Sequence, residues 1–232
     1  GFAVCFSFHP VKNLAMPKGG AITINQKNSK LLKQKLNSLR WCGITKRNGP
    51  FYDVSELGFN YYMDEISAAI GIEQLKKLGR LVETRQKIAD RLTDGLQGLS
   101  GLRLPIVRKD CTHVYYVFPL IVDVDKLGVS RGLIISALRA EGVSGLSEGY
   151  VNTHLLPMYQ KKIAYGSNGF PWTLKEARHD VDYAKGICPV AETLHEKTFI
   201  GFQMCVHELS YDDIDLVINA FKKVWENLSD LS

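Results

Sequence analysis

A long stretch of helical periodicity, residues 64–99, sets the strongest limit on how this chain can fold. Its apolar residues recur every three or four positions, the pattern of an amphipathic helix with one buried face. They are Ile66, Ala69, Ile70, Leu75, Leu78, Leu81, Ile88 and Leu92. Shorter helical patterns alternate with β-branched and aromatic segments on both sides of this stretch. We therefore predict an α/β chain in two structural parts, residues 1–90 with the long helix and residues 91–232.

The segments around the long helix give further expectations. Residues 1–8 predict a buried strand that ends at His9-Pro10, because proline cannot donate to a ladder. The leucines of residues 31–39 predict a helix capped by Asn28 or Ser29. Residues 42–58 predict a loop, and residues 143–187 have no regular pattern. The other predicted elements are strands at 21–24, 114–122 and 199–206, and helices at 132–141, 189–197 and 210–228, the last with a Ser210/Asp213 capping box.

Composition excludes several classes of protein. Among 232 residues, 29 basic and 24 acidic side chains leave a net charge of +5, and no run of five like charges occurs. We therefore expect no nucleic acid as a partner. No apolar run reaches the ~18 residues that a membrane helix needs, so we expect no membrane partner either. Five widely spaced cysteines without a CxxC pair indicate free thiols in a reducing compartment, with no disulfide framework or metal site. A cytoplasmic location follows.

The first segment with chemical potential is Ser7-Phe8-His9-Pro10-Val11-Lys12-Asn13, followed by Gly19-Gly20. A lysine directly after a buried strand lies where loss of water favours its use as a nucleophile that forms a Schiff base. Ser7 and nearby backbone N–H groups could hold a phosphate. The alternative is an ordinary surface lysine in a turn.

The second segment is Gly58-Phe59-Asn60-Tyr61-Tyr62-Met63-Asp64-Glu65, which leads into Ser67-Ala68-Ala69-Ile70-Gly71. Its small residues allow close packing of the helix that follows. Alone, it is typical of a loop that caps a buried helix. Together and in this order, the two segments resemble the lysine motif and the later motif of the DegT/DnrJ/EryC1/StrS family of pyridoxal-phosphate (PLP) sugar aminotransferases. Cys188-Pro189-Val190-Ala191-Glu192 resembles a third family motif, P-V-A-E.

The resemblance implies a fold-type-I PLP-transferase, with residues 1–90 as the end of the large PLP-binding domain and 91–232 as the small C-terminal α/β domain. It implies an enzyme that moves an amino group from glutamate or glutamine to a nucleotide-linked keto sugar, for polysaccharide biosynthesis, through a Schiff base on Lys12. It implies a homodimer, because Asn60 matches an asparagine that reaches the cofactor phosphate of the neighbouring subunit. The remaining implied roles are phosphate binding for Ser7, a place near the cofactor for His9, and substrate binding for Tyr150 and His154.

The sequence also departs from the family pattern. Pro17 and Lys18 stand where the family has Gly-Glu, and Tyr62 stands where it has arginine, which indicates an atypical subfamily. Only six residues precede Ser7, whereas most of the large domain precedes this position in the family. We therefore expect that a missing N-terminal half completes the site, as part of a longer product or as a separate chain. The alternative is a truncated, non-catalytic dimerisation or regulatory module. Exposed apolar surface is expected along residues 1–40 if the missing half is absent.

Overall fold

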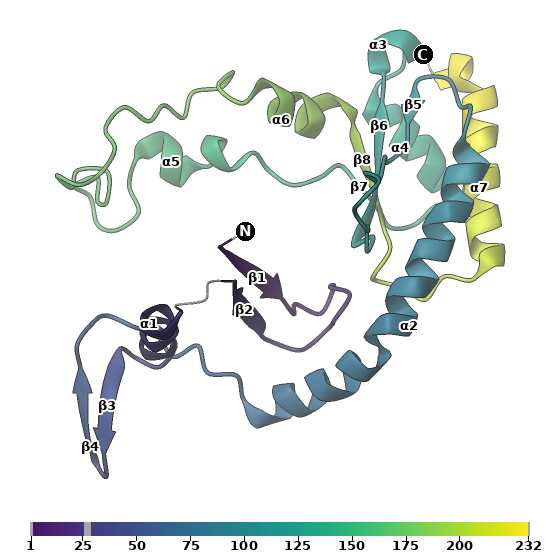
Figure 1. Ribbon diagram of the computed structural model, residues 1–232. Coiled ribbons are helices and arrows are strands. Elements are labelled where there is room, and N and C mark those ends of the chain that lie inside the picture. Colours follow the sequence, from purple (N-terminus) through teal and green to yellow (C-terminus); the bar gives the residue numbers. More distant parts are fainter. Residues whose placement is uncertain (1, 26–28, 232) are drawn as a thin grey trace. The chain divides into compact units, whose positions relative to one another are not determined.

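The computed structural model describes residues 2–25 and 29–231, and they form two compact units, Gly1–Glu83 and Thr84–Ser232 (Figure 1). The boundary falls inside the long helix α2 (Glu65–Leu96), whose extent agrees with the predicted 64–99. Helices account for 42% and strands for 16% of the structure, which confirms the predicted mixture of helix and sheet.

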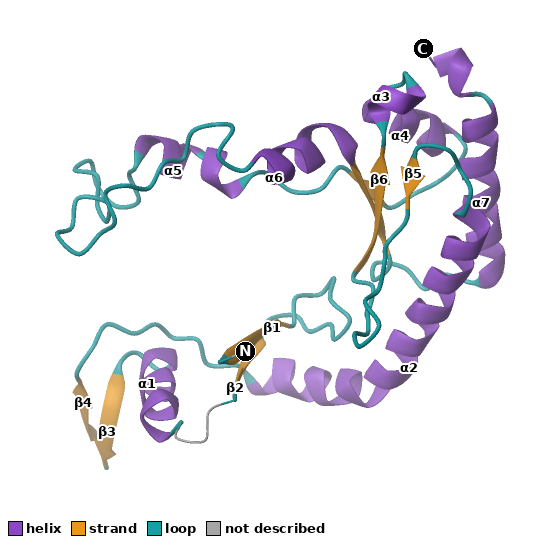
Figure 2. Cartoon of the chain, turned by 45° about the horizontal axis from the view of Figure 1, so that its top comes forward, coloured by secondary structure: helices purple, strands orange, loops and turns teal. Residues whose placement is uncertain are grey.

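In the part of the first unit that the structure describes there are two β-hairpins, helix α1 and the first part of α2 (Figure 2). Strands β1 (Ala3–Ser7) and β2 (Gly20–Ile24) pair antiparallel, with Ser7 opposite Gly20. Helix α1 (Lys30–Arg40) follows; Ser29 occupies its cap position without a side-chain hydrogen bond, and Asn28, the other predicted cap, lies outside the described residues. Strands β3 (Ile44–Asn48) and β4 (Phe51–Val54) form the second hairpin, and α2 begins after it.

The β3–β4 hairpin shows that the predicted loop at 42–58 is wrong. Asn48 pairs with Phe51, so Gly49-Pro50 forms a two-residue turn. Gly49 adopts a φ of 60°, a conformation that glycine accepts without steric cost. Glycine at the first position of a two-residue loop is typical of a type II′ hairpin turn, so the glycine of this segment belongs to a hairpin and not to an irregular loop.

The first unit has almost no apolar interior of its own. Met16 is the one large apolar side chain that is buried among its described residues. Strand β1 is mostly exposed, which corrects the predicted buried strand at 1–8: its partner is β2, and no further strand covers it in the described part of the sheet. The expected exposed apolar surface along residues 1–40 is confirmed. It consists of Phe2, Val4, Phe6, Ile22 and Leu31.

The second unit is built on an antiparallel sheet of four described strands in the order β5-β6-β8-β7. They are β5 (Leu102–Arg103), β6 (Val117–Val122), β7 (Leu146–Ser147) and β8 (Phe199–Gln203). Alternate β6 residues Phe118, Leu120 and Val122 are fully buried, the pattern of a sheet with one face in the core. Helices α4 (Arg131–Ala140) and α7 (Tyr211–Glu226) pack together and, with the end of α2, share that core (Figures 1 and 2).

The remaining elements of the second unit are short. They are α3 (Val124–Leu127), η1 (Thr153–Leu155), α5 (Pro157–Lys161), α6 (Pro189–Thr193), the π-helical turn η2 (Leu194–Thr198) and η3 (Leu228–Leu231). The predicted helix at 189–197 is therefore confirmed in extent but changes type at Leu194. The buried Arg131 guanidinium explains the change, because it donates to the carbonyls of Leu194, His195 and Phe199 at 3.3, 2.6 and 3.3 Å.

Among the described residues, no helix is long and apolar enough to cross a membrane.

The predicted capping box at the start of α7 is present, and it gives a first prediction. Asp213 N–H donates to Ser210 Oγ at 3.1 Å, and Ser210 N–H donates to Asp213 Oδ2 at 2.8 Å. We expect Ser210→Ala to lower the free energy of unfolding by about 1 kcal/mol, because a donor of the first turn loses its acceptor. Urea unfolding followed by circular dichroism measures this loss. Ser167→Ala, in an exposed loop, is the control and should leave the midpoint unchanged.

Candidate functional site

The turn after β1 brings three predicted site residues together. His9 N–H donates to Ser7 Oγ at 3.4 Å, and Lys12 N–H donates to the His9 carbonyl at 2.8 Å. His9 Nδ1 accepts the Val11 N–H at 3.4 Å. Pro10, which has no N–H, lies where the strand pairing stops. The serine hydroxyl and the lysine therefore share one turn at the end of a strand, with Lys12 half-buried and Ser7 exposed.

The glycine pair and the second segment meet this turn through methionine side chains. A Cβ on Gly19 would lie 3.0 Å from Met63 Cε and 3.4 Å from Met16 Cε, and a Cβ on Gly71 would lie 2.7 Å from Met16 Sδ. A Cβ on Gly20 would lie 2.7 Å from the Phe6 carbonyl oxygen. Small residues at these positions therefore allow the hairpin, the loop before α2 and the first turns of α2 to pack closely around Met16.

Asn60 lies in the loop that precedes α2. It forms an antiparallel bridge with Trp41, and its Oδ1 accepts the N–H of Tyr62 at 3.2 Å. Asp64 then begins the helix: its carboxylate accepts both the N–H and the hydroxyl of Ser67 at 2.7 Å. Hydrogen bonds from Ser67 lower the pKa of Asp64 below its usual value. Asn60 is thus fixed in a short bridged segment directly before a well-capped helix.

The close contact at Gly71 yields a second prediction with a matched control in the same helix. Gly71→Ala should reduce local stability by about 1–3 kcal/mol, because the methyl group overlaps Met16, whose side chain is already buried. Gly79→Ala meets no atom within 4 Å. It should instead stabilise α2 by up to about 1 kcal/mol. Hydrogen exchange of the amides in residues 14–20 and 65–72 measures both changes; equal protection in the two variants would contradict the predicted packing.

The two predicted substrate residues lie in the second unit. Tyr150 is exposed, and its hydroxyl is 2.8 Å from that of Tyr116. His154 lies in η1, and its Nε2 is 2.8 Å from Glu192 Oε1. Glu148, two residues before Tyr150, accepts from Arg131 Nη2 at 2.9 Å. The segment from Glu148 to His154 is therefore held at one end by an ion pair with Arg131 and at the other by a hydrogen bond to Glu192.

Glu192 and Arg131 are the residues that the sequence reasoning did not assign to the site. Both are buried, with 6% and 8% of their surface exposed, and both contact the segment that carries Tyr150 and His154. Glu192 ends the Pro-Val-Ala-Glu motif, so its position in a recognisable motif was the available signal. No pattern in the sequence links Arg131 to this segment.

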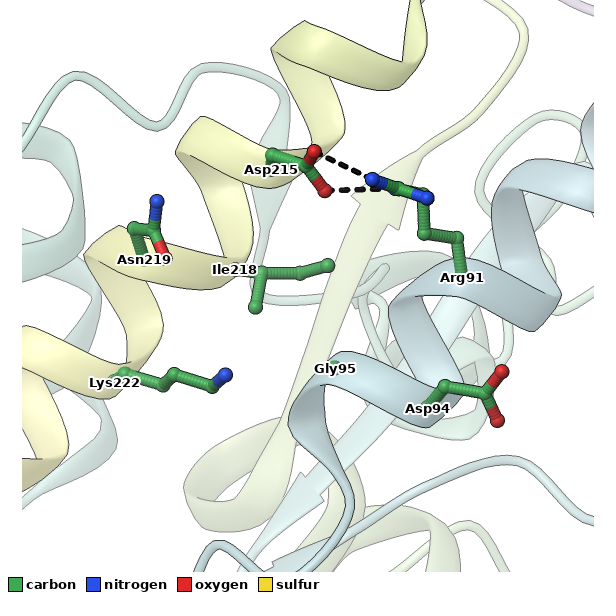
Figure 3. A pocket seen from close by; sticks show the side chains of 7 residues that line it. All are labelled: Arg91, Asp94, Gly95, Asp215, Ile218, Asn219 and Lys222. Carbon is green, nitrogen blue, oxygen red and sulfur yellow. Dashed lines mark hydrogen bonds and ion pairs between the residues drawn. The ribbon is translucent and has the colours of Figure 1, made fainter.

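A cavity of about 490 Å³ in the second unit involves none of the predicted site residues. It is a shallow hollow between α2 and α7, lined by Arg91, Asp94, Gly95, Asp215, Ile218, Asn219 and Lys222 (Figure 3). Arg91 and Asp215 form a two-bond ion pair across it, at 2.7 and 2.5 Å. We interpret it as a surface groove between two packed helices.

The described residues contain no group of three or more side chains suited to hold a metal ion.

Comparison with known proteins decides the family. The model of the DegT/DnrJ/EryC1/StrS aminotransferase family matches residues 1–182. The chain belongs to this family. A member from Bacillus subtilis, the spore coat polysaccharide biosynthesis protein SpsC, is 35% identical over 74% of this chain and 45% of its own length. An uncharacterised protein from Methanocaldococcus jannaschii is 28% identical over 97% of this chain and 54% of its own length.

A third relative is the UDP-4-amino-4,6-dideoxy-N-acetyl-β-L-altrosamine transaminase of Campylobacter jejuni. It is 33% identical to this chain over 67% of this chain and 40% of its own length. The chain thus spans about half the length of the curated relatives that it matches.

Solved structures confirm the fold-type-I assignment. DesV from S. venezuelae, solved in complex with a ketimine intermediate, has a TM-score of 0.73 at 25% identity and matches 97% of this chain and 52% of its own. The aminotransferase TlmJ from Streptoalloteichus hindustanus has a TM-score of 0.75 at 23% identity, over 99% of this chain and 53% of its own.

Proposed function

We propose that this chain supplies the lysine-bearing part of a PLP-dependent aminotransferase that moves an amino group from glutamate or glutamine to a nucleotide-linked keto sugar. The observation that carries the proposal is the turn after β1, where Ser7 and Lys12 lie five positions apart and both contact His9: the Ser7 hydroxyl accepts the His9 N–H, and the Lys12 N–H donates to the His9 carbonyl. The names of SpsC and of the Campylobacter transaminase support polysaccharide and UDP-sugar chemistry as the substrate class.

The residues present suit one end of a PLP site. A hydroxyl at Ser7 and a backbone turn beside a glycine pair are groups that bind phosphate. Gly20 approaches the Phe6 carbonyl so closely that a Cβ would not fit, so glycine at this position lets β2 pair closely with β1 beside Ser7. PLP, when bound, supplies the electron sink for the reaction. Lys12 would hold the cofactor through its amine and then move a proton to and from the reacting carbon.

The other site residues take supporting roles in this proposal. His9 holds the turn through its carbonyl and ring nitrogen, and Asn60 binds the cofactor phosphate of a second copy in a homodimer. Tyr150 and His154 contact the sugar nucleotide. Residues 1–90 complete a large cofactor domain, whose N-terminal half comes from the rest of the protein or another chain, and residues 91–232 form the small domain.

Cofactor trapping tests this proposal. The purified chain is combined with the N-terminal half of a relative and mixed with PLP, its visible spectrum is recorded, borohydride is added, and the product is digested for mass spectrometry. We expect a visible band that borohydride removes, with the reduced cofactor attached to Lys12. Lys18, on the same hairpin, is the internal control and should stay unmodified. Attachment to several surface lysines, or none to Lys12 when the N-terminal half of a relative is added, would contradict the proposal.

A non-catalytic assembly module is the second candidate, favoured by the apolar surface of the first unit. Besides the residues of positions 1–40, the side chains of Phe51, Val54, Leu57, Phe59 and Ile66 are more than half exposed. Such a surface is typical of a protein interface. Stable dimers without any cofactor attachment to Lys12 would support this candidate over the enzyme.

A further inference from the structure

A buried carboxylate collects four hydrogen-bond contacts in the second unit. Glu192 lies in α6 with 6% of its surface exposed. Gly186 N–H donates to both of its oxygens at 2.9 and 2.8 Å, and Cys188 N–H donates to Oε1 at 3.2 Å. His154 Nε2 lies 2.8 Å from the same Oε1. A buried charge is tolerated only with such partners.

These contacts determine which ring nitrogen of His154 carries the proton. Backbone amides can only donate, so the Glu192 oxygens act as acceptors. Burial disfavours the charged carboxylate, but hydrogen bonds from His154, Gly186 and Cys188 outweigh it and lower the pKa of Glu192. An ionised carboxylate has no proton to give. His154 must therefore donate through Nε2–H, and Nδ1 of the neutral ring is the nitrogen with a lone pair.

The second ring nitrogen of His154 is available to another molecule. Among the described residues Nδ1 has no hydrogen-bond partner, and unlike the unpartnered Nδ1 of His195 it is not sealed from solvent. The backbone beside the ring is held as well: Gln160 Nε2 donates to the carbonyls of His154 at 2.7 Å and of Tyr183 at 2.6 Å. Thus one edge of the ring is fixed by protein and the other is left open.

We propose that Glu192 is a positioning residue: it holds His154 by Nε2–H so that Nδ1 faces the substrate as a hydrogen-bond acceptor for a sugar hydroxyl or amide. This inference rests on the proposed function for the role of His154. A carboxylate that orients a histidine through one ring nitrogen fixes both the tautomer and the ring plane, the arrangement used around metals and in catalytic triads.

Ring ¹⁵N spectroscopy on the whole chain tests the proposal without cofactor or turnover. His154→Gln identifies the His154 signals by their loss. In the wild type we expect protonated Nε2 and unprotonated Nδ1 for the neutral ring. A mixture of both tautomers, as in a freely rotating imidazole, or the opposite tautomer would overturn the proposal. Because no PLP is present, this result is independent of the cofactor trapping, and either proposal can fail alone.

Two variants of Glu192 separate positioning from folding. In Glu192→Gln the amide oxygen faces Cys188 N–H and His154, so the tautomer should persist, while the Nε2–H proton resonance shifts upfield because a neutral acceptor binds more weakly than an ion. In Glu192→Ala the tautomer should become mixed. Glu196→Ala removes a nearby carboxylate that pairs with Lys185 at 2.7 Å, and should change neither signal. If Glu192→Ala does not fold, an unshifted proton resonance in Glu192→Gln would still overturn the proposal.

Discussion

Lys12→Ala should abolish amino transfer, with a loss of at least about 10²- to 10⁴-fold in rate, the contribution of a positioned acid–base group. The loss should exceed that for any other residue of the turn, because under the proposed function Lys12 is both the attachment point and the proton carrier. The measurement is formation of 2-oxoglutarate from glutamate in the assembly that binds PLP. An unchanged rate in Lys12→Ala would refute the proposed mechanism.

Lys12→Arg tests whether the reaction needs the amine of Lys12 as a nucleophile and base or only its positive charge. Arginine keeps the positive charge but remains protonated and cannot act as a nucleophile or base. We therefore expect the same loss as for alanine. Lys18→Ala removes an exposed lysine from the same hairpin and should leave the rate unchanged. Recovery of activity in Lys12→Arg would show that only a cation is needed at this position.

The parts of the fold that the sequence predicted correctly are those specified by local pattern. The apolar residues that predict the long helix at 64–99 lie in one continuous segment, and the structure places α2 at Glu65–Leu96. The burial of this stripe was predicted correctly only in part, because Ile66 and Leu75 are exposed whereas Ile88 and Leu92 are buried. The capping box of Ser210 and Asp213 is also local, because its two residues are only three positions apart. Strands β5 and β7 have two residues each, too few for a periodic signal. Their existence depends on pairing with β6 and β8, which no local pattern contains.

The same difference between local and long-range contacts decides which parts of the candidate site the sequence could predict. Ser7, His9 and Lys12 lie together because they are neighbours in the sequence, and a turn after a strand suffices to gather them. His154 and Glu192 are 38 positions apart, so their contact depends on the path of the intervening chain. The burial of β1 was predicted wrongly for a related reason: an apolar strand indicates that something covers it, but not that the cover belongs to the same 232 residues.

Phe221→Ala should be the most destabilising of the substitutions considered, with a loss of about 3–5 kcal/mol in the free energy of unfolding. Phe221 is 1% exposed on α7, its ring stacks on Trp225 at 5.8 Å, and it belongs to the core that unites α2, α4, α7 and the sheet. Alanine would leave a cavity that this core cannot easily close. Since a domain of this size is stable by only about 5–15 kcal/mol, the variant should approach unfolding at ordinary temperature.

Leu216→Ala is the matched control, because Leu216 lies on the same helix with 69% of its surface exposed. A substitution there should change stability by no more than about 0.5 kcal/mol. Urea unfolding followed by circular dichroism and by tryptophan fluorescence measures both variants. Trp225 reports on this core, so circular dichroism and fluorescence should show the same loss in the free energy of unfolding for Phe221→Ala. A loss below about 1 kcal/mol would mean that α7 does not unfold with the sheet, contrary to the core described above.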